Sequence, residues 1–253
     1  MTTPKAMILA AGLGTRLRPL TSNRPKALVE IAGRTMLEIA LARLHSFGVN
    51  EVIVNVHHFA DQVVDYLHTH ANFGMRIEVS REDELRDTGG GLKKAAWFFQ
   101  EDSANEHTPF ILYNVDVLSN IDLSRMLDIH NATRALATLA VQNRSTSRYL
   151  LFDDHNRLCG RRAGRGGTPE LVRPCPSPSA LAFSGIHMIS QRLLPLLTED
   201  GAFSIVTSYL RLAAQGENIQ AFPADEYYWR DLGRPENIAQ AEQDIRRALI
   251  SIE

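Results

Sequence analysis

Few cysteines and little excess charge are the first features of this sequence. Its 253 residues include two cysteines, Cys159 and Cys175. That number excludes a disulfide-rich scaffold and favours reduced thiols in a cytoplasmic protein. The formal net charge is -2 and the pI is near 6.5. A nucleic-acid-binding protein needs a basic face, so we expect no nucleic-acid partner.

Long hydrophobic runs, internal repeats and coiled-coil heptads are also missing from the sequence. The apolar run near the N-terminus ends at Gly12, which is too short for a membrane span or for a signal segment with its cleavage site. We therefore expect no membrane partner. With 44% hydrophobic residues, the chain can bury one good core, and we predict a single domain over 1–253.

Two common nucleotide-binding loops are incomplete at the start of the chain. Residues 5–11, KAMILAA, predict a buried parallel strand that runs into a turn with Gly12 and Gly14. A dinucleotide fingerprint needs a third glycine where this chain has Leu17, and a P-loop needs a Gly-Lys-Ser/Thr ending that is absent here. The sequence therefore disfavours a nicotinamide dehydrogenase.

The same turn carries positive charge. Arg16, Arg18 and Lys26 follow the two glycines closely. Open backbone N–H groups, small side chains and cations together suit a polyphosphate. Arg18 could equally form a surface salt bridge. We predict that this turn binds a polyphosphate.

The first half of the chain alternates strand and helix signals. Thr35 and Glu38 form a capping-box pattern at the start of a helix, and Gly48 lies where that helix should end. Further along, the sequence predicts strands at 51–56, 76–80 and 110–115 and helices at 62–70 and 92–100. This rhythm indicates an α/β, Rossmann-like fold, in which a mostly parallel mixed sheet has helices on both faces.

Asp116 directly follows the strand predicted at 110–115. Ligands of such sheets bind at the carboxyl ends of the strands. A carboxylate there can hold Mg²⁺ against phosphate oxygens, and a simple N-cap or turn aspartate is the alternative. Asp116 is thus the first candidate metal ligand.

The second half is less regular. Short strands at 148–152, 157–160 and 181–189 precede helical signals near Leu193 and at 206–214, a strand at 219–222 and a final helix from Pro235. Gly/Arg-rich residues 160–169 and Pro/Ser-rich residues 174–178 predict a mobile surface loop. We interpret this half as a small lobe inserted into the same domain.

A longer motif carries a family resemblance. Residues 10–21, AAGLGTRLRPLT, and 24–29, RPKALV, resemble the signature of the sugar-1-phosphate nucleotidyltransferases. The elements DTGGGL at 87–92, NVD at 114–116 and WRDLG at 229–233 are similar to further motifs of that family. The resemblance implies a GT-A-like fold with a nucleotide-binding half over about 1–130, a sugar-phosphate-binding half over about 131–235 and a C-terminal helix over 236–253.

The resemblance also implies roles for individual residues. Arg16 would bind the leaving β- and γ-phosphates, Lys26 would bridge the reacting phosphates, and Asp231 would complete the metal site with Asp116. The implied nucleotide-binding residues are Ala10, Ala11, Gly12, Gly14, Thr15, Arg16, Lys26, Gly89, Gly90 and Asn114. We expect the glycines of the 87–92 element to form a turn whose backbone groups lie against the base and ribose.

The acceptor side is less well marked. Gly185 lies in a segment similar to the family's sugar-facing strand, and Arg148 is a candidate for the sugar phosphate. Arginines 144, 148, 161, 162 and 165 could recognise an acidic sugar or its phosphate, but we expect most of them, with Glu82 and Glu84, to be solvated. The chain lacks the Glu-Lys-Pro element of many hexose-1-phosphate members, and Arg234 replaces a usual threonine.

The implied reaction joins an NTP and a sugar 1-phosphate into an NDP-sugar and pyrophosphate, with Mg²⁺. The short length resembles that of bacterial N-acetylmuramate-1-phosphate uridylyltransferases, so UTP is the favoured donor and the enzyme would act after a sugar kinase. Guanylyl and thymidylyl transfer are the nearest alternatives to uridylyl transfer. A cytidylyltransferase for a phosphorylated alcohol such as phosphocholine and a catalytically silent NDP-sugar-binding regulator are the alternatives. A homo-oligomer is left open.

Overall fold

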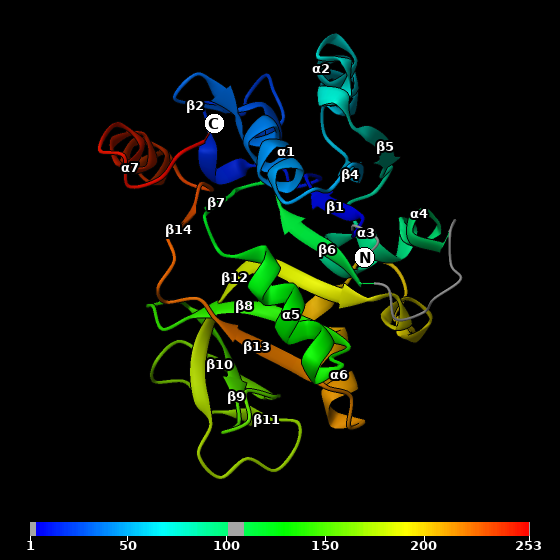
Figure 1. The fold of residues 1–253 in the computed structure, drawn as a ribbon, viewed down its shortest axis with the longest axis vertical. Coiled ribbons are helices and arrows are strands. Elements are labelled where there is room, and N and C mark those ends of the chain that lie inside the picture. Colours follow the sequence, from blue (N-terminus) through cyan, green and yellow to red (C-terminus); the bar gives the residue numbers. More distant parts are fainter. Residues whose placement is uncertain (1–3, 101–108, 253) are drawn as a thin grey trace.

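Four parallel strands form the N-terminal part of a ten-stranded mixed sheet in the computed structural model, which describes residues 4–100 and 109–252 (Figure 1). These strands are β1 (Ala6–Leu9), β4 (Glu51–Val56), β5 (Arg76–Arg81) and β6 (Pro109–Asn114). In the sheet, β1 lies between β4 and β6, and the carboxyl ends of all four strands share one edge. The predicted strands of the first half are confirmed to within a residue or two.

The second half extends the same sheet with antiparallel strands. The long strand β12 (Ser179–Ser190) pairs with β6 and so joins the two halves. The other members are β8 (Ala137–Gln142), β9 (Arg148–Phe152), β10 (Leu158–Ala163), β11 (Glu170–Leu171) and β13 (Ile219–Pro223), the last parallel to β8. Two short ribbons lie outside this sheet, β2 (Glu30–Ile31) with β3 (Arg34–Thr35) and β7 (Val117–Ser119) with β14 (Trp229–Asp231).

Helices cover both faces of the sheet, as predicted. Alternating residues of β1 divide the core, because Met7 packs in one hydrophobic cluster and Ile8 in the other. The cluster around Ile8 includes side chains from α1 (Met36–Ser46), α2 (Ala60–Thr69), α5 (Leu123–Thr133) and α7 (Pro235–Arg246). The cluster around Met7 includes side chains from α3 (Asp87–Lys94), α4 (Ala96–Gln100) and α6 (Ile205–Ala214). The 3-10 turns are η1 (Thr15–Leu17), η2 (Lys26–Leu28), η3 (Ala71–Gly74) and η4 (Gln191–Leu196).

The predicted limits of α1 are confirmed. Thr35 Oγ1 accepts a hydrogen bond from the Glu38 N–H at 3.1 Å. Gly48 adopts φ 96° just after the helix, which is the left-handed conformation that ends many helices. A capping residue and a terminating glycine act over only a few residues, so the limits of α1 could be predicted from the local sequence.

Two predicted segments were wrong. The 92–100 helix is two shorter helices, α3 and α4, and α3 begins earlier, at Asp87. The Gly/Arg stretch is not entirely irregular, because β10 extends to Ala163 and β11 pairs with it, with Arg161 opposite Glu170. The composition of these residues indicates a loop, but hydrogen bonds to the neighbouring strand β9 hold them in a strand.

Both cysteines lie buried without a disulfide. Burial and the neighbouring Cys175 raise the pKa of Cys159 to about 12, so its thiol stays protonated near neutral pH. Within the described residues, no helix is both long enough and apolar enough to cross a bilayer.

Candidate active site

A cavity of about 640 Å³ opens where the two halves of the sheet meet. It takes side chains from the end of β6, from β9, β10 and β12, and from β14. Five of the predicted site residues line it, namely Asn114, Asp116, Arg148, Gly185 and Asp231. Residues more than a hundred positions apart in the sequence thus share one cavity.

Asp116 and Lys26 form an ion pair beside this cavity. Lys26 Nζ donates to Asp116 Oδ2, and both side chains are largely buried. Lys26 begins the turn η2 after Pro25, and Asp116 follows β6. Asp116 lies 90 residues after Lys26 in the chain. The ion pair therefore fixes Lys26 next to the carboxylate that we predict to be a metal ligand.

Asp231 reaches Asp116 through the small ribbon of β7 and β14. In this ribbon Asp231 lies opposite Val117, and the Leu232 N–H donates to the Asp116 carbonyl at 2.8 Å. A Cβ built on Gly233 would lie 2.7 Å from Asp231 Oδ1, 2.8 Å from Arg16 Nη2 and 3.4 Å from Asp116 Oδ2. Three of the four charged side chains predicted for the chemistry therefore converge on one point, and Lys26 holds the Asp116 carboxylate there.

This donor set fits a magnesium ion. Mg²⁺ prefers oxygen ligands and is usually held by one or two carboxylates together with substrate phosphates and water. Asp116 and Asp231 supply two carboxylates, and no group of three or more His, Cys, Asp or Glu side chains suited to a metal occurs among the described residues. Substrate phosphate oxygens and water would have to complete the coordination.

The turn after β1 has a conformation that requires glycine. Gly14 adopts φ 63°, and a Cβ there would lie 3.0 Å from Thr21 Cγ2 and 3.1 Å from Lys26 Cβ. Glycine alone adopts this left-handed conformation freely. Thr21 Oγ1 also donates to the Gly14 carbonyl at 2.8 Å. These contacts bring Lys26 against the turn that carries Thr15 and Arg16.

The expectation that Glu82 is solvated was wrong. Glu82 is buried and accepts hydrogen bonds from Asn55 Nδ2 at 2.7 Å and from the Arg86 N–H at 3.0 Å. Asn55 Oδ1 in turn accepts from the Ala10 N–H at 2.8 Å. This buried chain of hydrogen bonds connects the start of the turn after β1, where Ala10 and Ala11 lie, to the start of α3.

The glycines of the 87–92 element belong to the first turns of α3. The Gly89 and Gly90 N–H groups donate to the Phe203 carbonyl at 2.9 and 3.3 Å. A Cβ on Gly89 would meet the Phe203 ring at 2.3 Å. The expected open turn is therefore wrong, because these two N–H groups are already paired and the glycines let α3 approach the segment before α6. Contact of Gly89 and Gly90 with a nucleotide stays a prediction.

Asn114 and Gly185 touch across the cavity wall. Gly185 adopts φ 76°, and a Cβ there would lie 2.8 Å from Asn114 Nδ2. The pairing of β12 with β8 shifts register between Phe183 and His187, which places Gly185 in a bulge. Asn114 Oδ1 is buried without a hydrogen-bond partner. An orphaned acceptor at a cavity wall is the kind of group that a ligand hydroxyl or N–H satisfies.

Arg144 is better ordered than the sequence suggested. Its guanidinium carbon lies 3.7 Å from the centre of the Trp229 ring, and Nη2 donates to the Phe183 carbonyl at 2.7 Å. Its Nε is buried without a partner. Burial lowers the pKa of Arg144, while the nearby Asp231 carboxylate raises it. The tryptophan that begins the WRDLG element was the available signal, because an arginine stacks well on an indole ring.

The arginines of β9 and β10 divide into two groups. Arg161 pairs with Glu170 at 2.7 Å, whereas Arg162 lies 5.4 Å from the centre of the Tyr149 ring. Arg148, Arg161 and Arg162 all line the cavity. Within the described part of the chain, Arg148 and Arg162 form no ion pair. Arg148, Arg161 and Arg165 are exposed, as expected for most of these arginines, whereas Arg144 and Arg162 are half-buried.

A buried histidine, His187, is among the residues that line the cavity. His187 Nδ1 lies 2.8 Å from Tyr209 Oη, and burial lowers the pKa of His187 to about 3. The ring is therefore neutral near pH 7. No pattern in the sequence singles out this histidine, because its burial depends on the packing of α6, which carries Tyr209, against β12.

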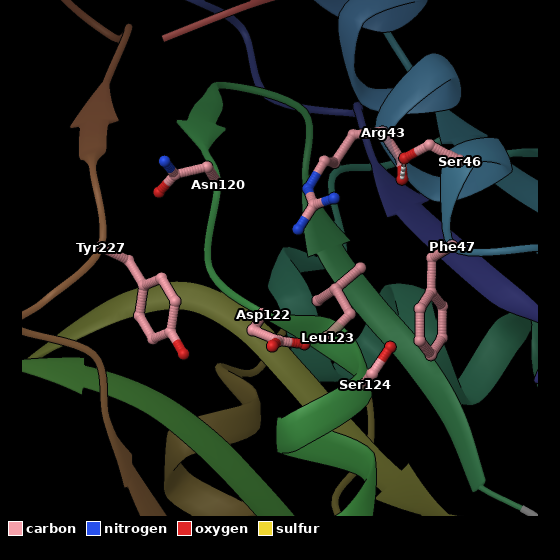
Figure 2. Close-up of a pocket in the computed structure, with 8 residues that line it drawn as sticks. All are labelled: Arg43, Ser46, Phe47, Asn120, Asp122, Leu123, Ser124 and Tyr227. Carbon is pink, nitrogen blue, oxygen red and sulfur yellow. Dashed lines mark hydrogen bonds between the residues drawn. The ribbon is translucent and has the colours of Figure 1, made fainter. Parts of the chain in front are cut away.

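A second, shallower cavity of about 430 Å³ lies between the end of α1 and the start of α5 (Figure 2). Figure 2 shows Arg43 extending across it from α1, and Arg43 Nη2 donates to the Ile121 carbonyl at 2.5 Å. None of the predicted site residues is among the described residues that line it. We assign it no part in the chemistry.

Comparison with known families agrees with the motifs. The profile of a family described as nucleotidyl transferase matches residues 5–152. The N-acetylmuramate alpha-1-phosphate uridylyltransferase of Caulobacter vibrioides is 33% identical over 251 residues, covering 96% of this chain and 97% of that protein. The mannose-1-phosphate guanylyltransferase of Mycobacterium tuberculosis is 27% identical, over 96% of this chain but 65% of its own length.

Solved structures show the same fold at lower identity. HddC from Yersinia pseudotuberculosis, solved in complex with GMP-PN, superposes with a TM-score of 0.74 at 22% identity, covering 96% of this chain and 99% of that one. A UDP-glucose pyrophosphorylase in complex with UDP-glucose superposes with a TM-score of 0.75 at 17% identity, covering 98% of this chain and 100% of that one. These matches confirm the predicted Rossmann-like, GT-A-like architecture.

Proposed function

The chain belongs to the nucleotidyl transferase family, and from that premise we propose that it transfers a nucleotidyl group from an NTP, with UTP favoured, to a sugar 1-phosphate in the presence of Mg²⁺. The observation that carries the proposal is the convergence of Arg16, Asp116 and Asp231 on the position of Gly233, with Lys26 bound to Asp116. Cations and metal-binding carboxylates in one place suit a reaction between two phosphates.

The donor would lie along the turn after β1. Gly12 has open space where a Cβ would be, so a phosphate chain could approach the backbone there. In our proposal the triphosphate contacts Ala11, Gly12, Gly14 and Thr15, with Arg16 on the β- and γ-phosphates. Asn114 and the Gly89–Gly90 segment would face the nucleoside, and Asn114 Oδ1 is an unpaired acceptor suited to that contact.

The reaction is a single in-line displacement. An oxygen of the sugar 1-phosphate attacks the α-phosphorus, the bond from that phosphorus to the bridging oxygen of the β-phosphate breaks, and pyrophosphate leaves. Asp116 and Asp231 would hold Mg²⁺, which supplies charge neutralisation to the reacting phosphates. Lys26 would lie between the two anionic substrates, while Arg16 would stabilise charge on the leaving pyrophosphate. No covalent enzyme intermediate is needed.

The acceptor would occupy the part of the cavity that β9, β10, β12 and β14 surround, with Gly185 against the sugar and Arg148 near its phosphate. Arginines favour an anionic acceptor over phosphocholine, whose quaternary ammonium group is recognised by aromatic cages. The identity with the Caulobacter enzyme supports UTP as the donor. Phosphorylation of the anomeric hydroxyl by a sugar kinase is one route to a sugar 1-phosphate, and we place this enzyme after such a kinase, in the cytoplasm.

The experiment that tests the proposal is pyrophosphate release by the purified full chain over a grid of five NTPs and several sugar 1-phosphates. The acceptors are glucose, mannose, N-acetylglucosamine, N-acetylmuramate and heptose 1-phosphates, with phosphocholine as the control. We expect one productive pair that needs Mg²⁺, with UTP as its donor. Activity with CTP and phosphocholine alone would support the cytidylyltransferase alternative instead.

The silent-regulator alternative has a separate signature. If no pair reacts but calorimetry shows tight binding of an NDP-sugar, the proposed catalysis is wrong. The retention of Arg16, Lys26, Asp116 and Asp231 in one cluster argues against this outcome, because a protein that only binds would have no need of the metal-binding pair.

A further inference from the structure

We propose that the buried ion pair between Arg230 of β14 and Asp244 of α7 positions the metal site: it holds the ribbon that carries Asp231 and so sets the affinity for the metal ion. The inference rests on the proposed function, since it takes Asp231 as a ligand of Mg²⁺. Arg230 and Asp244 are not among the described residues that line either cavity. They are therefore positioning residues, which act on the site through the backbone of β14.

Asp116 and Asp231 are supported in different ways. Asp116 directly follows β6, which pairs with β1 on one side and with β12 on the other. Asp231 ends β14, which has three residues and pairs with β7 in a separate two-stranded ribbon. A two-stranded ribbon is at best marginally stable by itself, whereas the groups of a functional site must be held to within about 0.5 Å. Other contacts must therefore fix the position of Asp231.

One face of β14 is attached to β12. The Trp229 Nε1–H donates to the Ser184 carbonyl at 2.7 Å. Successive side chains point to opposite faces of a strand, so Trp229 and Asp231 share one face of β14 and Arg230 lies on the other. The contact that attaches the opposite face of the ribbon must therefore come from Arg230.

Arg230 binds a buried carboxylate on α7. Its Nη2 donates to Asp244 Oδ2 at 2.6 Å, and its Nε donates to Tyr228 Oη at 3.0 Å. Tyr228 Oη in turn donates to the same carboxylate oxygen at 2.7 Å, while Gln240 Nε2 donates to the other oxygen at 2.9 Å. Asp244 is only 4% exposed. Three donors thus satisfy this carboxylate, and two of them come from β14 and the residue just before it.

Helix α7 holds the ribbon at a second point as well. Figure 1 shows α7 beside β14, and Asn237 Nδ2 of α7 donates to the Asp231 carbonyl at 2.8 Å. Asn237 and Asp244 are seven residues apart, which is two turns and about 10 Å along a helix. Ile238 and Ala241, which lie between them, pack in the hydrophobic cluster around Ile8. A helix seated in the core thus holds the ribbon at both ends of a 10 Å span.

Stability alone is a poor reason for this ion pair. Burying two charges costs free energy that their attraction scarcely recovers, and apolar residues of similar volume often replace a buried pair without loss of stability. Charge-assisted hydrogen bonds nevertheless fix direction and distance more strictly than apolar contacts do. The best-attested use of such pairs is to fix register. Here the register is that of β14 on α7, which places the Asp231 carboxylate beside Asp116.

The experiment removes both charges at once. In Arg230→Met with Asp244→Met no buried charge is left without a partner, so the thermal midpoint should stay within about 4 °C of the wild-type value. Mn²⁺ alone is the probe, and the electron paramagnetic resonance signal of the free ion measures its binding. We expect the dissociation constant for Mn²⁺ to rise about tenfold in the double variant. Asp231→Asn shows the effect of losing a ligand.

Two further proteins test for a merely structural effect. Arg192→Met with Glu217→Met is the matched control, because this half-buried pair joins η4 to the segment after α6 and lies outside both cavities. It should leave the Mn²⁺ affinity within twofold of the wild-type value. Arg230→Lys keeps the charge and should recover part of the affinity.

A wild-type Mn²⁺ affinity in the double variant overturns the inference, and so does an equal loss of affinity in the control pair. If the double variant fails to fold, Asp244→Asn takes its place, because it keeps the volume of the side chain. We then expect a rise of about threefold in the same dissociation constant, and an unchanged constant overturns the inference.

The Mg²⁺ dependence of the reaction separates this inference from the proposed function. With the best substrate pair, the double variant should need about tenfold more Mg²⁺ for half-maximal pyrophosphate release, with kcat at saturating Mg²⁺ within threefold of the wild-type value. A merely structural defect would lower kcat at every Mg²⁺ concentration. If no substrate pair reacts but the double variant loses Mn²⁺ affinity, the proposed catalysis fails and the inference stands. If the wild type and Asp231→Asn bind Mn²⁺ equally, Asp231 is not a ligand and the inference is overturned.

Discussion

The proposed donor half, over about 1–130, and the proposed acceptor half, over about 131–235, hold their cations in different ways. Lys26 is bound to Asp116, a carboxylate that would also hold the metal. Arg144 has no carboxylate partner among the described residues and is held by the Trp229 ring and the Phe183 carbonyl. If Asp116 holds the metal as proposed, Lys26 would have to exchange partners when substrate and metal bind. An arginine fixed by neutral groups is ready to receive an anion, so little ordering is needed on binding.

The largest expected effect is a loss of kcat when the cation of the donor half is removed. Lys26→Ala should lower kcat about 10²- to 10³-fold, because one stabiliser of transition-state charge is lost. Steady-state pyrophosphate release with the best substrate pair measures it. Lys93→Ala is the matched control, since Lys93 pairs with Asp200 at the surface, and it should change kcat less than twofold. A rise in KM alone, with kcat unchanged, would mean that Lys26 only binds substrate.

The next effect concerns the stability of the acceptor half. Burial lowers the folded-state pKa of His187 to about 3, below the unfolded value of about 6.5. Stability from the neutral ring is therefore present above about pH 6.5 and is lost as the pH falls toward 3. Between pH 7.5 and 4.5, the wild type should lose roughly 2–3 kcal/mol more than His187→Gln.

Urea unfolding at the two pH values measures this difference. His68→Gln, at an exposed histidine of α2, should leave the pH dependence as in the wild type. If His187→Gln and the wild type lose the same free energy on acidification, His187 is not the buried neutral group that the acceptor half depends on.

The smallest expected effect is a rise in KM for the sugar 1-phosphate when Arg144 of the acceptor half is replaced. Arg144→Lys keeps the charge but loses the planar stack on Trp229 and the fork of donors. We expect about a tenfold rise in KM for the sugar 1-phosphate, with KM for the NTP within twofold of the wild-type value. Initial rates with one substrate varied at a time separate the two constants. An equal rise in both would show that Arg144 serves the whole site and that the two halves do not divide the substrates.

Local patterns predicted much of the fold and part of the site. The strand at 51–56 was predicted to the residue, because hydrophobic periodicity and its flanks are local signals. Asp116 and Lys26 were found because each lies inside a distinctive motif. Their ion pair is a tertiary contact, yet the common chemistry of phosphates and metals made their proximity a reasonable expectation.

The errors came from residues whose environment is set by distant segments. Glu82 was expected to be solvated, but Asn55 and the Arg86 backbone bury its carboxylate in hydrogen bonds. The glycines at 89 and 90 indicated an open turn, but Phe203 accepts both of their N–H groups. Arg162 lies in a stretch with the composition of a loop, and pairing with β9 places it in the cavity wall.

By itself the sequence determined the α/β class, the helix caps and the donor-side motif, because each depends on residues that are neighbours along the chain. The tertiary structure alone decided how Asp231 is brought to Asp116, through the ribbon of β7 and β14, that Trp229 holds Arg144, and that Arg162 lines the cavity. The physical reason is that burial and strand pairing bring together groups more than a hundred residues apart. Those neighbours determine whether a charged side chain is solvated, paired with another residue or unpaired and able to bind a ligand.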